Sequence, residues 1–264
     1  MRGRRLPLRY TAVVKTHHAP LFTSRTLSFL RALKRNNDRA WFAAHREDYQ
    51  RYVQQPLLDF VDLMATELKS LAPELAASPK ASLFRIYRDT RFSSDKRPFK
   101  TQVGVLFPNR DLHRNQSACL YVEIGPDGCM IFGGIYRPDR PELLAIREHV
   151  AHTHRRLTAL VEAPAFKRIV GAIEGQPLRR VPTGYPPAHP AAEYLKFRHF
   201  LLGKEYPAAF ATAPGFLREI LSLFRHMAPV VRYLNEPLLA AQRARDPLQD
   251  HAERRAPKRV SRTL

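Results

Sequence analysis

The sequence ACLYVEIGPDGCMIFGGIY, residues 118–136, contains two apolar runs on either side of a short polar segment. The runs are Ala118–Ile124 and Cys129–Tyr136, and Gly125-Pro126-Asp127-Gly128 lies between them. Short β-rich runs bounded by Gly, Pro and Asp are typical of strands joined by a tight turn. The stretch therefore predicts an antiparallel hairpin.

The two cysteines of the chain, Cys119 and Cys129, flank this turn. If residues 125 and 128 close the turn, Cys119 pairs near Gly134 and Cys129 pairs near Ile124, so the two thiols do not face each other. We therefore expect both to be free, small core residues in a reducing compartment, which indicates the cytoplasm. We interpret Gly133-Gly134 as a bulge or a tight backbone contact, not as a phosphate loop.

Outward from the hairpin, the sequence alternates between strand-like and helix-like segments. Three further short runs are predicted strands, namely Leu83–Tyr87, Gln102–Phe107 and Tyr194–Leu202. Apolar residues at three- and four-residue spacings predict helices, which we place at Ser24–Arg35 with Ser24 as N-cap, from Asp38 to Val53, from Pro56 to Leu71, after residues 138–141 as far as Arg156, from Pro164 and from Pro214. This order indicates the α+β class, with N-terminal helices, a mostly antiparallel central sheet and C-terminal helices.

The charge of the chain is strongly positive and uneven. The net charge is +20, from 44 Lys and Arg against 24 Asp and Glu. We expect a basic arm over residues 1–21, one α+β domain over 22–241, and a charged tail over 242–264 that starts as helix and then becomes disordered. A field of this sign attracts polyanions such as nucleic acid, phosphorylated metabolites or acidic membranes.

The densest group of charged residues is FRIYRDTRFSSDKRPFKT, residues 84–101. Its cations alternate with two carboxylates, Asp89 and Asp95. Guanidinium groups oriented by carboxylates are suited to phosphate or carboxylate ligands. We expect an anion site here, and its principal candidate residues are Arg85, Arg88, Arg91, Lys96 and Lys100.

Two other segments are expected to share a face with this one. In the strand that ends at Ile124, Tyr121 and Glu123 point away from the apolar side. A strand over 194–202 would place Lys196 and Arg198 together, and the loop that contains Arg180 would close over the groove.

Three motifs resemble one known family. They are FRIYRDTRFSSDKRPFKT, the earlier FLRALKRNNDRAWFAAHREDY at 29–49, and the later RRVPTGY at 179–185 followed by His189-Pro190. Together they resemble the uncharacterised family called domain of unknown function 2461, over about residues 22–225. The usual family pattern has Lys and Tyr where this chain has Ser94 and Phe99, so an amine or a phenol is lacking at those positions. The resemblance implies no activity, cofactor or catalytic residue.

The residues leave three hypotheses open. The first is a cytoplasmic module that binds a phosphate-bearing or other anionic ligand; if it is an enzyme, Asp89, Asp95 or Glu123 would act as a base or as a Mg²⁺ ligand. The second is a structural or protein-interaction domain in which the motif is an internal ion-pair lattice. The third is nonspecific nucleic-acid binding through the basic tails.

No cofactor and no metal site is predicted apart from that Mg²⁺ alternative. The three histidines His149, His152 and His154 have only one spacing that suits a metal on a helix. No apolar run approaches the roughly 18 residues of a transmembrane helix, so we expect no membrane partner. The sequence leaves the oligomeric state open.

Overall fold

The computed structural model describes residues 20–255, and for residues 245–255 it describes the backbone only. The strands are β1 (Val103–Pro108), β2 (Cys119–Ile124), β3 (Gly128–Ile135) and β4 (Phe200–Pro207). The α-helices are α1 (Ser24–Arg35), α2 (Arg39–Ala44), α3 (Arg46–Tyr49), α4 (Gln55–Leu71), α5 (Pro79–Ser82), α6 (Arg140–Val161), α7 (Pro164–Ile169), α8 (Ala192–Leu195) and α9 (Phe216–Arg255). A π-helical turn (Gln50–Gln54) precedes α4, and a 3-10 turn (Ala208–Thr212) follows β4.

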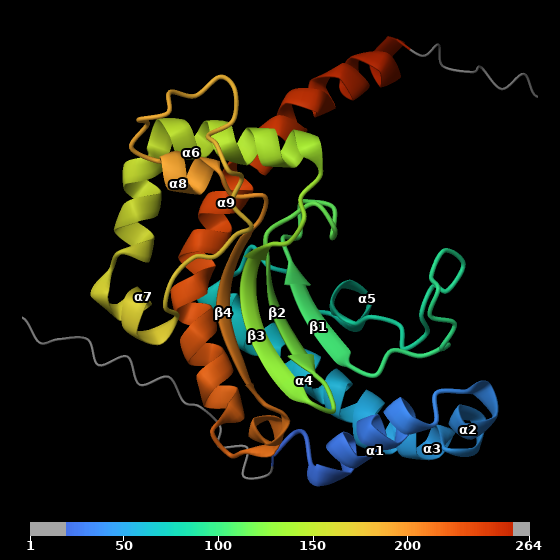
Figure 1. Ribbon diagram of the computed structural model, residues 1–264. Coiled ribbons are helices and arrows are strands. Elements are labelled where there is room, and N and C mark those ends of the chain that lie inside the picture. The colour runs from blue at the N-terminus through green and yellow to red at the C-terminus, as the bar shows by residue number, and fades with distance from the viewer. Residues whose placement is uncertain (1–19, 256–264) are drawn as a thin grey trace, which may run out of the picture.

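The four strands form one antiparallel sheet in the order β1-β2-β3-β4 (Figure 1). The predicted hairpin is confirmed, and so is its register, because Cys119 pairs with Gly134 and Cys129 with Ile124. Both cysteines are free. The α+β class with N-terminal helices, an antiparallel sheet and a C-terminal helix is confirmed.

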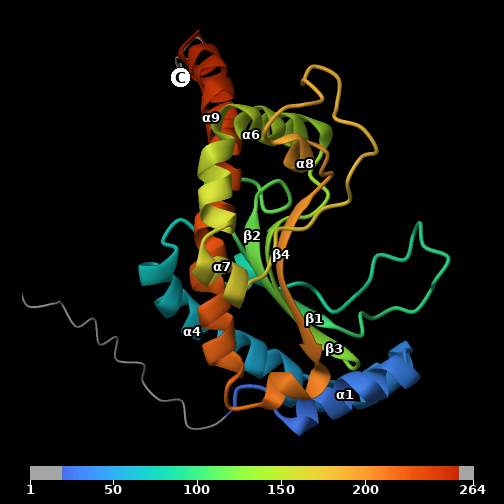
Figure 2. The same ribbon diagram turned by 60° about the vertical axis from the view of Figure 1, so that its left-hand side comes forward.

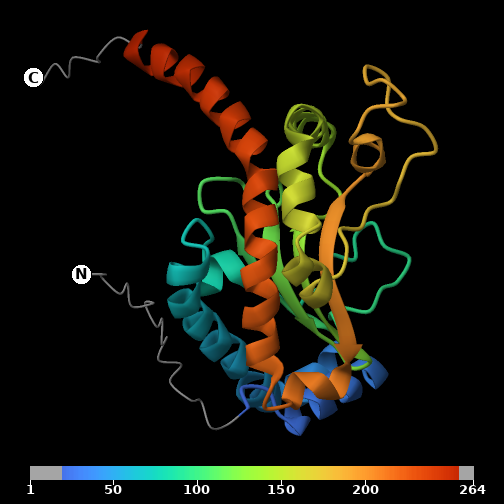
Figure 3. The same cartoon turned by 90° about the vertical axis from the view of Figure 1, so that its left-hand side faces the viewer.

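The helices of residues 20–255 cover one face of the sheet and leave the other face without a helix. In Figure 3, α9 and α4 lie on one side of the strands, while the segments around residues 84–101 and 174–191 project on the other side. The covered face carries the alternate residues of each strand; Phe107 of β1, for example, packs edge-on against Phe60 of α4 and Phe224 of α9. We call the uncovered side the open face.

The N-terminal helices differ in detail from the prediction. The N-cap of α1 is Thr23 instead of Ser24; its backbone is extended, and its N–H donates to Thr26 Oγ1 at 3.2 Å. Asp38 caps α2 as expected, accepting from the backbone N–H of Trp41 at 2.8 Å. The single helix expected from Asp38 to Val53 is wrong, because the chain leaves helical geometry at His45 and then passes through the π-helical turn into α4.

Two predicted strands also need correction. Leu83–Tyr87 is not a strand: only Leu83 and Tyr87 form isolated bridges, to Val105 and to Phe99. Residues 194–199 belong to α8 and a turn, so β4 begins at Phe200. The apolar alternation that favoured a strand there reflects packing of a short helix, since Leu195 is buried.

The helices after the sheet run longer than the sequence indicated. α6 continues past Arg156 to Val161 and bends at Thr153, whose hydroxyl donates to the carbonyl of His149 at 2.6 Å; such back-bonding commonly bends helices. α9 continues to Arg255, and its last turns project beyond the rest of the fold (Figures 1 and 3). The rest of the expected arm and tail, residues 1–19 and 256–264, lies outside the described residues.

The Gly133-Gly134 pair makes the tight backbone contact expected of it. Gly134 has φ +110°, and a Cβ atom there would lie 2.0 Å from the carbonyl oxygen of Phe200 on β4. Only glycine fits this position. Over the described residues, no helix is long and apolar enough to cross a bilayer.

Candidate functional site

Residues 84–101 form a projecting loop whose base is pinned to the domain. The Arg88 N–H donates to the Pro98 carbonyl at 2.9 Å, and the Lys100 N–H donates to the Ile86 carbonyl at 2.8 Å. The side chain of Asn37 bonds both the N–H and the carbonyl of Phe99, each at 3.0 Å. The loop is therefore held at its neck, while its tip lies in solvent (Figure 2).

Most of the charge in this loop is paired within the loop. Asp89 accepts from Arg91 at 2.7 Å, and Asp95 accepts from Arg88 at 2.5 Å and from Arg97 at 2.7 Å. Hydrogen bonds from Arg91 lower the pKa of Asp89 to about 2, and those from Arg97 and Arg88 lower the pKa of Asp95. Carboxylates held ionised in this way are weak proton acceptors at neutral pH.

The other three predicted cations have different surroundings. Lys96 donates to the Thr90 carbonyl at 3.0 Å, and Arg85 is exposed. The ammonium group of Lys100 lies 4.9 Å from the centre of the Phe84 ring. Lys100 also lies close enough to Arg85 and to Glu123 for their charges to affect it.

A small cation cluster forms where this loop meets the sheet, and we define it as Arg85, Lys100 and Arg114. Arg114 lies 4.2 Å from the Phe84 ring and donates to the carbonyls of Ser82 and Leu83. Its Nε is buried and has no partner among the described residues. Burial lowers the pKa of Lys100, and the positive charges of Arg114 and Arg85 lower it further.

One carboxylate faces this cluster from the sheet. Tyr121 and Glu123 point to the open face as predicted, away from the buried Leu120 and Val122. The Tyr121 hydroxyl donates to Glu123 Oε2 at 2.6 Å, and burial followed by the charge of Glu123 raises the pKa of Tyr121. Gly104 is needed beneath this pair, because a Cβ there would lie 2.4 Å from the Tyr121 hydroxyl.

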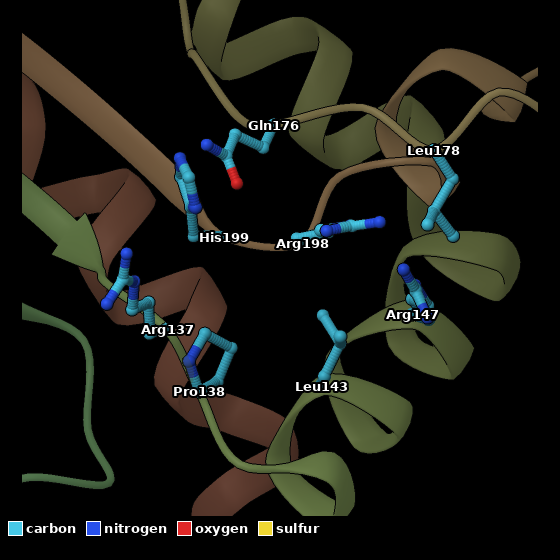
Figure 4. Close-up of a pocket in the computed structure, with 8 residues that line it drawn as sticks. All are labelled: Arg137, Pro138, Leu143, Arg147, Gln176, Leu178, Arg198 and His199. Carbon is cyan, nitrogen blue, oxygen red and sulfur yellow. The ribbon is translucent and has the colours of Figure 1, made fainter.

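A second cationic site lies at the end of the sheet where β3 finishes and β4 begins. It is a pocket of about 480 Å³ (Figure 4), which we call the arginine pocket. Its lining residues are Arg137, Pro138, Leu143, Arg147, Gln176, Leu178, Arg198 and His199. None of them is a carboxylate.

Four different segments bring these side chains together. Arg137 and Pro138 follow β3, and Leu143 and Arg147 lie one turn apart on α6. Gln176 and Leu178 come from a segment held beside residues 196–201, where the Arg198 N–H donates to the Gln176 carbonyl at 3.1 Å. Arg198 and His199 immediately precede β4. In Figure 4 the side chains surround one central space.

Arg147 is the most deeply buried charge of this pocket. The residue is only 7% exposed. Its Nη2 donates to the Phe197 carbonyl at 2.9 Å, and its Nε has no partner among the described residues. Burial lowers the pKa of Arg147, and Arg198 acts in the same direction. A buried guanidinium is ordinarily paired with an anion, so burying Arg147 without one lowers the stability of the fold.

Two neighbours add to the unusual character of the site. Burial lowers the pKa of His199, and the positive charge of Arg137 lowers it further. Arg137 has φ +48°, and it is the only positive φ at a non-glycine position among the described residues. Such backbone strain concentrates at functional sites.

Of the three predicted cations outside the 84–101 loop, one, Arg198, lines the arginine pocket. Lys196 is paired with Glu193 at 2.7 Å, and Arg180 is exposed on the loop without lining the pocket. Sequence reasoning missed Arg114, Arg137, Arg147 and His199. Of these four residues, only Arg147 could have been found from the sequence, because it is a charged residue on the apolar face of its helix, together with Leu143, Ile146 and Val150.

Among the residues whose side chains the structure describes, no group of three or more His, Cys, Asp or Glu is arranged to hold a metal ion. His149 instead lies with its Nε2 3.3 Å from Glu236 of α9, which also pairs with Arg156 at 2.8 Å. This network joins α6 to α9 near the bend at Thr153.

Comparison with known proteins places the chain in a family. No curated protein matches the chain. The family model described as "Conserved hypothetical protein (DUF2461)" matches residues 25–233, which include the loop at 84–101, the sheet and the arginine pocket. Because this match covers well over half of the sequence, the chain belongs to the DUF2461 family of conserved hypothetical proteins.

Proposed function

We propose that this protein is a cytoplasmic module that binds a small phosphate-bearing or other anionic ligand in the arginine pocket. One observation carries the proposal: three arginines and a histidine surround a pocket of about 480 Å³ that no carboxylate lines, and one of these arginines is buried with an unpaired Nε. An anion in this space would supply the missing partner.

The geometry suits a phosphate better than a neutral ligand. Guanidinium groups present planar pairs of N–H donors that match the oxygens of phosphate and carboxylate. Arg147 approaches from α6 and Arg198 from the segment before β4, so the two can contact one anion from different sides. Leu143, Leu178 and Pro138 supply the apolar part of the wall, which leaves room for more than the anionic group alone.

The loop at residues 84–101 is a weaker candidate for the primary anion site. Arg88, Arg91 and Arg97 are already paired with Asp89 or Asp95, so an incoming anion would have to compete with these carboxylates. This pairing favours the structural hypothesis for the loop itself, as an ion-pair lattice that fixes its shape. The cytoplasmic location is supported by two free cysteines, which suit a reducing compartment.

The proposal is tested by thermal unfolding of the full chain with and without pyrophosphate. At a hundred times its Kd, a ligand stabilises by about 2.7 kcal/mol, which raises the Tm of a domain of this size by about 5–10 °C. Arg198→Gln removes a pocket cation whose side chain makes no hydrogen bond among the described residues, and it should abolish most of this shift. Arg180→Gln is the matched control, since it removes an exposed charge near the pocket without touching its lining. Equal shifts in both variants would refute the proposal.

A further inference from the structure

Exposed aromatic side chains gather on the 84–101 loop and at the end of β3. Among the described residues the large exposed hydrophobic side chains are Phe84, Tyr87, Phe92, Tyr136 and Leu144. Four of these five are aromatic, and they lie on the 84–101 loop or at the end of β3. Exposed aromatic rings mark surfaces that bind planar or amphipathic partners.

Three of these rings are accompanied by a cation. Phe84 has Lys100 at 4.9 Å and Arg114 at 4.2 Å, Phe92 has Arg91 at 5.7 Å, and Tyr136 has Arg137 at 5.1 Å. The Tyr136 ring also lies 5.6 Å from the ring of His199, so it stands at the rim of the arginine pocket. Rings interleaved with cations are the arrangement that binds unpaired bases and their phosphates.

The floor between the two cationic sites is apolar and aromatic. Phe84 packs edge-on against Tyr121 of β2, and Tyr121 pairs across the sheet with Phe132 of β3. Tyr136 lies four residues after Phe132, just beyond the end of β3. With about 3.3 Å per residue along a strand and 4.8 Å between strands, the Cα atoms of Tyr121 and Tyr136 lie about 14 Å apart.

We propose that the open face binds single-stranded nucleic acid, with phosphates at the cation cluster and in the arginine pocket and bases on the rings between them. This inference rests on the proposed function, because the arginine pocket supplies one of its phosphate sites. The path from Tyr121 to Tyr136, about 14 Å long, corresponds to about four stacked bases at a rise of about 3.4 Å each. The apolar floor distinguishes this ligand from polyphosphate, which has nothing to place on aromatic rings.

Two carboxylates of the strands, Glu123 and Glu205, do not block this path. Glu123 accepts from Tyr121 and faces Lys100, which offsets its charge. Glu205 lies towards the end of β4 that is remote from the pocket, since the pocket residues Arg198 and His199 precede the strand. A duplex would present no free base to Phe84 or Tyr136, so the site should discriminate against it.

The test is fluorescence anisotropy with labelled 12-nucleotide U and dT strands, and with the same dT strand annealed to its complement, on the full chain. Tyr136→Ala should weaken single-strand binding roughly tenfold, the usual effect of losing one stacked base, and Tyr136→Phe should retain it. Lys100→Gln should weaken binding and reduce the slope of log affinity against log salt by about 0.7. Arg225→Gln is the matched control, because it removes an exposed charge from α9 on the covered side of the sheet.

The binding and thermal unfolding experiments distinguish failure of this inference from failure of the proposed function. If Tyr136→Ala and Lys100→Gln bind as tightly as the unaltered chain, the nucleic acid is held elsewhere, by the basic tails, and the inference is wrong. If the strands do not bind but anionic vesicles do, and Phe92→Ala abolishes that binding, the face recognises lipid headgroups and the inference is again wrong. In either case a pyrophosphate shift that Arg198→Gln removes would leave the proposed function intact. Comparison of the U and dT strands then tells RNA from DNA.

Discussion

Replacing Arg147 with methionine should separate stability from binding. Methionine extends about as far as the Nε atom of arginine but carries no charge, and its flexible side chain fits irregular spaces. The substitution removes a buried, unpaired Nε, whose burial costs about 1–3 kcal/mol, and it also removes a charged hydrogen bond to the Phe197 carbonyl that contributes about 1.5–3 kcal/mol. These effects nearly cancel, so we expect the free energy of unfolding without ligand to change by about 1 kcal/mol or less.

The same substitution should remove most of the response to pyrophosphate. The measurement is a pair of thermal unfolding curves for Arg147→Met, without ligand and with saturating pyrophosphate. We expect a ligand-free Tm within about 4 °C of the unaltered chain, together with a loss of most of the ligand-induced rise. A ligand-free Tm lower by more than about 10 °C, with the pyrophosphate shift preserved, would show that Arg147 is a structural brace and that the reasoning about its unpaired donor is wrong.

Three further predictions concern backbone strain, pH and the core. Arg137→Gly should leave the Tm unchanged or slightly raised, because glycine adopts φ +48° without the roughly 1–2 kcal/mol cost borne by other residues, while pyrophosphate affinity by calorimetry should fall. Sulfate, which does not titrate near neutral pH, should bind more tightly as the pH falls from 8 to 6. Burial and Arg137 hold the pKa of His199 below its ordinary value in the free protein, and a bound anion raises that pKa, so protonation of His199 favours binding. A calorimetric series of sulfate affinity against pH should therefore be flatter for His199→Asn. Asn235→Ala should lower stability by about 3 kcal/mol in thermal unfolding, because it leaves the buried N–H and carbonyl of Ala118 without their partners at 2.8 and 2.9 Å; a loss below about 1 kcal/mol would show that water replaces the amide.

The strands of the sheet were largely predictable from the sequence, because their signals are local. Alternation, turn residues and the Gly-Pro-Asp-Gly segment define the hairpin, its register and the orientation of Tyr121 and Glu123. The expected strand at 83–87 failed for a physical reason. Its residues alternate, but only Leu83 and Tyr87 form isolated β-bridges, and the chain leaves the sheet to form the loop.

The candidate site was only partly predictable. The density of charged residues pointed to residues 84–101, but it does not reveal whether a cation is already paired. Three of the arginines there form ion pairs with Asp89 or Asp95. The arginine pocket depends on four segments that meet only in the folded chain, so Arg137 and His199 carry no local signal. Arg147 alone was detectable, as a charge on an apolar helix face.

The most direct test is a crystal structure of the full chain soaked with tungstate, a phosphate-shaped anion whose position is given by anomalous scattering. We predict a tungstate within hydrogen-bonding distance of Arg147 Nε and of the Arg198 guanidinium, with no other pocket residue displaced. An empty arginine pocket in a crystal that holds tungstate elsewhere would contradict the account.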